Sequence, residues 1–158
     1  MTELSALEVS RWFVLRNNMN TQQYGDELLS HLKLQKLLYY AQGIFLAYTN
    51  GKSLFNEEIH AWDHGPVVPG VYTEYKEHGR DEIEFNPEHT DMELLDKVSG
   101  NEEIKMVLEF VYTNYGKYSA WHLRNKTHEE RPWKVTPRNK IIKKEVIQDY
   151  FMKEVLVD

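Results

Sequence analysis

The sequence predicts a mainly α-helical (α+β) domain, a compact set of helices with a small β element near residues 57–62. Apolar residues between positions 30 and 48 recur every three or four residues, the spacing of one helical face. Ser residues followed three positions later by Glu mark helix starts. Strand-like segments do not alternate with helices, which argues against a parallel doubly wound sheet.

The first helix is expected to begin after Ser5. The Ser5 hydroxyl can accept a hydrogen bond from the Glu8 amide, while the Glu8 carboxylate reaches back to the start of the helix. The apolar side of this helix carries Val9, and the helix is expected to run to about Asn18. A polar loop then leads to the second helix.

The second helix is expected to begin at Ser30 and to end at Gly51, which readily adopts a positive φ. Gly43 inside it costs about 1 kcal/mol relative to Ala, which indicates that another backbone comes close. Tyr39 and Tyr40 are neighbours on a helix, so we expect at most one of them to face the core and the other to lie near the edge.

The middle of the chain is expected to hold a strand at residues 57–62, because this short segment is flanked by turn-forming residues. Gly65 marks a turn. Pro69 suits the first position of a helix, where its missing amide costs nothing, and Gly79 is its expected end. The following segment, 80–92, reads as acidic and irregular.

Three further helices are expected in the last third of the chain. A capping-box pattern at Ser99 opens one, and Gly116 closes it. Ser119 caps a short helix that continues through Asn125. The last helix covers roughly residues 143–152.

The length of 158 residues predicts one domain, residues 1–158. The chain has no Cys, which excludes thiol catalysis, disulfides and cysteine-based zinc sites. No apolar run is long enough to span a bilayer, and the N-terminus lacks the pattern of a signal peptide. We therefore expect a cytoplasmic protein. The net charge of −6 argues against nucleic-acid binding, although a basic stretch at residues 131–144 leaves a local phosphate contact open.

His60, Asp63 and His64 form the tightest group of titratable residues. They could serve as metal ligands or as an acid–base pair, or Asp63 and His64 could stabilise the turn before Gly65. His122 and His128 are too far apart for the helical metalloprotease pattern of two His four residues apart. We favour the structural or partner-contact alternative and expect no catalytic residue, no metal and no cofactor.

Aromatic residues make up 13% of the chain and recur in polar surroundings. Tyr and Trp combine a large apolar body with a hydrogen-bonding tip, which suits a binding surface as well as a core. We weigh a rim around the core evenly against a contact surface for another protein. The candidate partner-binding residues are Tyr40, Trp62, His64, Tyr72, Trp121 and His128.

Three motifs resemble those of the Panacea domain, the family of SocA-like antitoxins and GepA-like phage-associated proteins. They are LKLQKLLYYAQG at residues 32–43, AWDHGPVVPGVY at 61–72, and YSAWHL at 118–123 followed by THE at 127–129 and PWK at 132–134. The motifs occur in the family's order and together span most of the chain.

The resemblance implies a mainly helical domain with a small β element. It also implies an antitoxin of a bacterial or prophage toxin–antitoxin system, which neutralises a separately encoded protein toxin by direct binding. An alternative within the family is an adaptor that delivers its toxin to a cytoplasmic protease. Two further alternatives are an enzyme built on His60, Asp63 and His64, and a DNA-binding autoregulator that uses the basic stretch.

Overall fold

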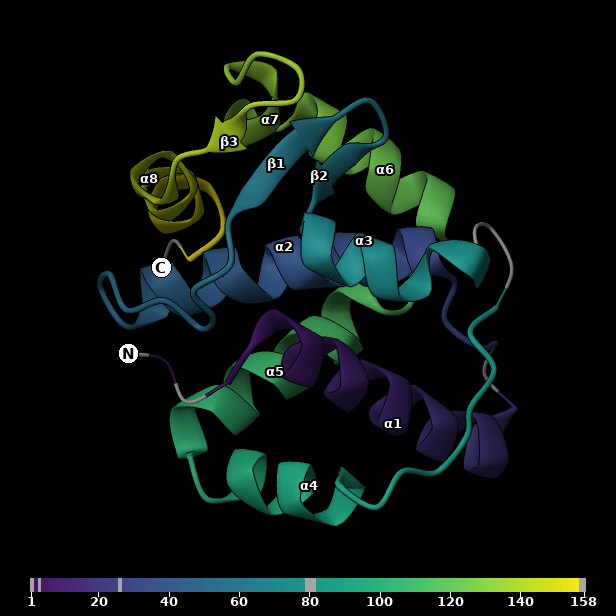
Figure 1. Cartoon of the computed structure of the whole chain (residues 1–158). Coiled ribbons are helices and arrows are strands. Elements are labelled where there is room, and N and C mark those ends of the chain that lie inside the picture. The colour runs from purple at the N-terminus through teal and green to yellow at the C-terminus, as the bar shows by residue number, and fades with distance from the viewer. Residues whose placement is uncertain (1, 3, 26, 79–81, 157–158) are drawn as a thin grey trace.

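The computed structural model describes residues 2, 4–25, 27–78 and 82–156, which fold into a set of helices with a small sheet at one side (Figure 1). Within these residues the helices are α1 (Ala6–Tyr24), α2 (His31–Tyr48), α3 (Pro69–Tyr75) with the 3-10 turn η1 (Lys76–His78), α4 (Asp91–Ser99), α5 (Glu102–Tyr115), α6 (Ala120–Glu129), α7 (Arg131–Lys134) and α8 (Lys144–Glu154). The strands are β1 (Ile59–Trp62), β2 (Gly65–Val67) and β3 (Ile141–Ile142), paired antiparallel in the order β2-β1-β3. The predicted fold class is confirmed.

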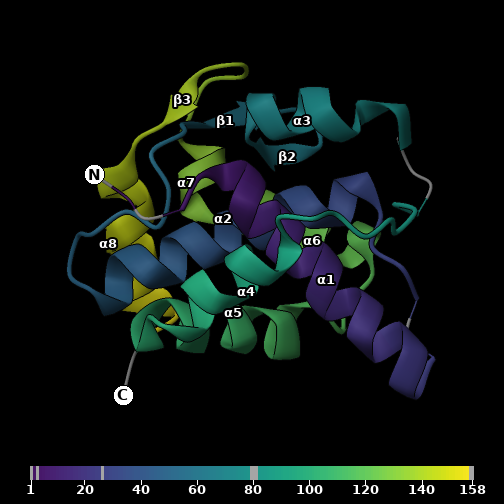
Figure 2. The same ribbon diagram turned by 60° about the horizontal axis from the view of Figure 1, so that its bottom comes forward.

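Helix α2 crosses the middle of the molecule and packs against α1, α3, α5, α6, α8 and β2. Figures 1 and 2 show the sheet and α7 on one side of it, and α1, α4 and α5 on the other. Every residue from Leu34 to Ala47 is buried. A helix that is buried on all sides must find internal partners for its polar side chains. No helix of the described residues is long and apolar enough to cross a membrane.

Several predicted helix starts are confirmed. The Ser5 side chain accepts from Glu8 N, and the Glu8 carboxylate accepts from Ser5 N, which completes the capping box of α1. Ser30 and Ser119 cap α2 and α6 through their side-chain oxygens alone, which accept from Lys33 N and His122 N. Pro69 occupies the first turn of α3. Gly79, its predicted end, lies outside the described residues.

Other boundaries differ from the prediction. Helix α1 continues past Asn18 to Tyr24, and α6 continues past Asn125 to Glu129. The start assigned to Ser99 was wrong, because Ser99 ends α4 and the side chain of Asn101 caps α5.

The sheet is larger than the single predicted strand, because the segments around Gly65 and Ile142 pair with β1. Side chains alternate within β1: Ile59 and Ala61 are buried, while His60 and Trp62 are half-buried. Gly43 has a close neighbour, as predicted, but it is a side chain and not a backbone. A Cβ at this position would overlap the Phe151 ring of α8.

Polar side chains of α2 hold the segments that surround it. Gln42 Nε2 donates to Phe55 O at 2.8 Å, and Gln42 Oε1 accepts from Leu54 N at 2.7 Å. Lys36 is fully buried, and its Nζ donates to Pro66 O at 3.1 Å. Breaking one of these bonds would leave a buried polar group unpaired, at a cost of about 1–3 kcal/mol. The bonds therefore fix the position of the chain before and after β1.

Tyr39 and Tyr40 are both fully buried, so the expectation that one of them lies near the edge was wrong. Their hydroxyls donate to the two carboxylate oxygens of Glu130, at 3.0 and 2.9 Å. Burial raises the pKa of Glu130, and the bonds from the tyrosines and Lys126 oppose that shift. Two neighbouring residues can be buried here because α2 is enclosed on all sides and one carboxylate accepts from both rings.

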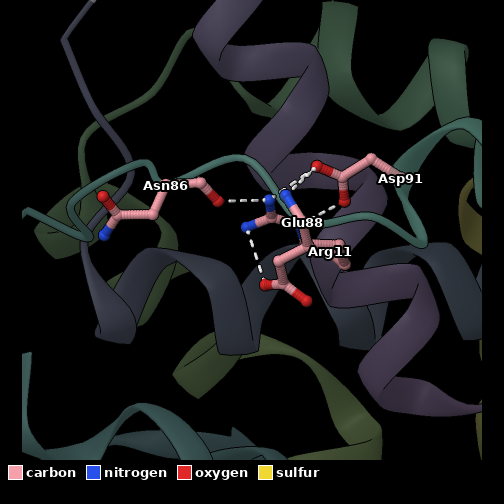
Figure 3. Close-up of polar contacts among 4 residues, drawn as sticks. All are labelled: Arg11, Asn86, Glu88 and Asp91. Atoms are coloured by element: carbon pink, nitrogen blue, oxygen red, sulfur yellow. Dashed lines mark hydrogen bonds and ion pairs between the residues drawn. The ribbon is translucent and has the colours of Figure 1, made fainter.

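Arg11 of α1 anchors the irregular segment before α4 (Figure 3). Its Nε and Nη2 donate to the two carboxylate oxygens of Asp91, both at 2.9 Å, and Nη2 also donates to Asn86 O at 2.7 Å. Glu88 adds an ion pair at 3.3 Å. The bonds from Arg11 hold the pKa of Asp91 below its usual range. Bidentate pairs of this kind are among the stronger polar contacts.

Asp91→Asn is expected to lower the free energy of unfolding by about 1–3 kcal/mol at pH 7. Because the pKa of Asp91 is lower in the folded chain, its stabilising effect is present above the unfolded pKa of about 4 and is lost as pH falls. The loss of unfolding free energy that Asp91→Asn causes should therefore be smaller at pH 3 than at pH 7. Chemical denaturation of both chains at the two pH values measures it. The exposed pair Lys153–Asp149 provides the control: Asp149→Asn should change stability by less than about 0.5 kcal/mol. An equal loss in both variants would contradict the role of Arg11.

Lys36 makes stability depend on pH in a second window. Burial, with a smaller effect of the Arg124 charge, lowers the pKa of Lys36 from 10.5 to about 7. Between these values the unfolded chain binds more protons, so stability should rise with pH, by up to about 1.4 kcal/mol per unit. Lys36→Met should abolish this rise between pH 7 and 9, as measured by urea denaturation. If the unfolding free energy rises equally with pH in the variant and in the original chain, Lys36 is not the cause of the pH dependence.

Candidate partner-binding groove

A surface groove lies where the first turn of α2, helix α3, the β1–β2 turn and the start of α6 meet; Figure 1 shows α3 and α6 beside α2, with the hairpin above. It has an outer pocket of about 550 Å³ and an inner pocket of about 250 Å³. Both pockets are lined by His31, Leu32, His64 and Tyr72. The outer pocket adds Ser30, Lys76, Ala120 and Trp121, and the inner pocket adds Gln35, Trp62, Asp63, Val67 and Asn139.

Four of the six predicted contact residues meet at this groove: Trp62, His64, Tyr72 and Trp121. They come from three segments that are separate in sequence. Pro69 starts α3 directly after β2, which brings Tyr72 back beside β1. Ser119 caps α6 and thereby sets Trp121 in its first turn. That these side chains contact a partner stays a prediction.

Ring contacts hold the centre of the groove in place. The ring of Tyr72 meets His31 edge-on, with centroids 4.9 Å apart, and meets Trp62 edge-on at 5.0 Å. Tyr72 nevertheless remains 38% exposed. Rings held by such contacts lose little freedom when a partner binds, so this part of the surface is preorganised.

Trp121 is 61% exposed, more than Tyr72 of the same groove. The guanidinium of Arg124, one turn further along α6, lies over this ring at 4.7 Å. Arg124 Nε also makes a long hydrogen bond, 3.5 Å, to His64 Nδ1 in the β1–β2 turn. Arg124 therefore links the two sides of the outer pocket.

His128 does not line the groove, but it contacts two of the segments that do, α6 and the β1–β2 turn. Its two ring nitrogens contact Arg124 O at 2.7 Å and Asp63 O at 2.8 Å, which ties α6 to the β1–β2 turn. Its ring packs on Trp133 at 3.9 Å, and Trp133 Nε1 donates to Trp62 O. We therefore assign His128 a positioning role.

Tyr40 was expected to contact a partner, and its position corrects that expectation. The side chain is fully buried, stacks on Tyr115 at 4.1 Å and donates to Glu130. A contact with another protein would require opening of the core, so Tyr40 is left out of the proposed surface.

The titratable cluster does not assemble into a metal site. His60 and Asp63 lie on the β1–β2 hairpin, and Asp63 and His64 form the turn that precedes Gly65. Gly65 has a φ of 111°, and a Cβ there would lie 2.9 Å from Lys36 Cε, so only glycine fits. In the part of the chain that the structure describes, no three His, Asp or Glu residues are grouped to hold one metal ion.

Sequence reasoning missed Gln35, Arg124 and Asn139. Gln35 stands inside the apolar run of α2, and a polar residue at a buried position was a usable signal. Asn139 lines the inner pocket with a left-handed φ of 69°, and Arg124 gave no signal of its own. In the basic stretch, Arg138 lies over Trp133 and donates to two backbone carbonyls.

Comparison with known proteins agrees with the motifs. The family model described as "Antitoxin SocA-like, Panacea domain" matches residues 34–134, which run from α2 to α7. The chain is 33% identical over 115 residues to Antitoxin SocA of Caulobacter vibrioides, an alignment that covers 70% of this chain. The chain spans 61% of the length of that relative. No solved structure matches significantly.

The matched segment contains the buried polar contacts of α2 as well as most of the groove. It covers more than half of the chain, and all three motifs lie largely inside it. On these grounds the chain belongs to the family of SocA-like antitoxins that carry the Panacea domain.

Proposed function

We propose that this chain is the antitoxin of a bacterial or prophage toxin–antitoxin system, and that it neutralises a separately encoded protein toxin by binding it through the groove. The observation that carries the proposal is the meeting of Trp62, Tyr72 and Trp121 at one accessible, preorganised surface. The family and the relative named Antitoxin SocA support the same role.

The mechanism is stoichiometric capture. Tyr72 and Trp121 provide apolar area at the surface, and the ring contacts of Tyr72 reduce the entropy that binding costs. Aromatic anchors at the centre of an interface commonly contribute 2 kcal/mol or more, while surrounding residues exclude water. The toxin is held inactive as long as the complex lasts, and no covalent bond is made or broken.

The experiment is co-expression with the protein encoded beside this chain, followed by binding measurements on the purified pair. Trp121→Ala should weaken binding about 30-fold, the equivalent of about 2 kcal/mol, and should reduce protection of the cells. Because Trp121 is 61% exposed, the thermal unfolding midpoint should stay unchanged. The matched control is Tyr48→Ala, which removes a 50% exposed ring at the other end of α2 and should leave binding intact.

Two outcomes would contradict the proposal. If the neighbouring protein stays toxic when it is co-expressed with this chain, then this chain has no antitoxin activity toward it. If Trp121→Ala protects as well as the original chain, the groove is not the binding surface. The half-life of the toxin in cells separates capture from delivery to a cytoplasmic protease: capture leaves it unchanged, and an adaptor shortens it.

A further inference from the structure

One residue that lines the inner pocket carries a buried hydrogen-bond donor for which the described residues supply no acceptor. Gln35 of α2 is 1% exposed and lines this pocket. Its Nε2 has no hydrogen-bond partner among the described residues. Buried side-chain amides are normally bonded, and an unpaired one costs about 1–3 kcal/mol. A buried donor at the wall of a pocket is therefore a position where a ligand can gain a strong contact.

The orientation of the Gln35 amide is fixed by the backbone. Val68 N donates to Gln35 Oε1 at 2.8 Å. If the amide were turned over, two donors would face each other at this position. The oxygen must therefore point toward Val68, and the NH₂ group is the part that remains for a ligand.

The other walls of the inner pocket restrict what can bind there. Trp62 and Tyr72 provide apolar surface, and Asp63, an exposed acidic residue, lines the same pocket. A carboxylate ligand would carry the same charge as Asp63, and its burial against the neutral Gln35 amide would be costly. A carboxamide is neutral, offers an oxygen to Gln35 Nε2 and offers its own NH₂ to Asp63.

We propose that the inner pocket binds the carboxamide of an Asn or Gln side chain from the toxin, with Gln35 Nε2 as donor and Asp63 as acceptor. This inference rests on the proposed function for the identity of the partner. The neighbouring residues of the same toxin segment lie over Trp121 in the outer pocket, which is lined mostly by apolar and aromatic groups. Asn139 also lines the inner pocket.

The first test needs no toxin. Propionamide, which carries the proposed group, is titrated into ¹⁵N-labelled protein up to tens of millimolar, and the side-chain amide signals are followed by NMR. The Gln35 signal should shift progressively. Gln42 is the internal control, because it is buried on the same helix and both ends of its amide are already bonded. A motionless Gln35 signal, or an equal shift with propionate, would overturn the inference.

The second test uses the toxin and Gln35→Glu. This variant keeps an oxygen for Val68 N and replaces the NH₂ donor by an acceptor. It should weaken toxin binding about 10-fold or more while the circular dichroism spectrum is retained. Gln23→Glu, the same change at an exposed position of α1, should have no effect.

The variants separate this inference from the proposed function. Loss of binding in both Trp121→Ala and Gln35→Glu supports both. Loss in Trp121→Ala alone overturns the carboxamide assignment and leaves the groove in place. No neutralisation by the original chain defeats the proposed function, and the propionamide titration still decides the assignment.

Discussion

Burial of α2 on all sides is the constraint on which the rest of the structure depends. Once every residue from Leu34 to Ala47 lies in the core, each polar side chain among them needs a partner from another segment. Gln42 holds the chain before β1, Lys36 holds β2, and the two tyrosines hold Glu130. These bonds set the positions of the hairpin and α6, and thereby the walls of the groove.

The groove forms where this helix comes to the surface. His31 and Leu32 in the first turn of α2 form part of both pockets, and Gln35 one turn later reaches the inner one. The oxygen of the same amide accepts from Val68 N, while its nitrogen is buried and has no hydrogen-bond partner among the described residues. Gln35 thus connects the buried scaffold to the groove, and His128 connects α6 to the β1–β2 turn.

The sequence predicted helix starts well and pairing between distant segments poorly. Capping at Ser5, Ser30 and Ser119 depends on residues three positions apart, so it can be recognised locally. The pairing of Ile141–Ile142 with β1 joins segments about eighty residues apart, and no local pattern indicates it. Tyr40 was misplaced for the same reason, because the carboxylate that permits its burial comes from Glu130. Trp62, Tyr72 and Trp121 were found by residue type, and only the fold shows that they meet.

Hydrogen–deuterium exchange of the chain, free and in complex with the proposed toxin, tests the central claim most directly. If the toxin occupies the groove, backbone amides in residues 30–36, 62–72 and 119–124 should exchange more slowly in the complex. Amides of α4 and α5, which lie on the other side of α2, should be unchanged (Figure 1). Protection confined to α4 and α5, with none at the groove, would contradict the account.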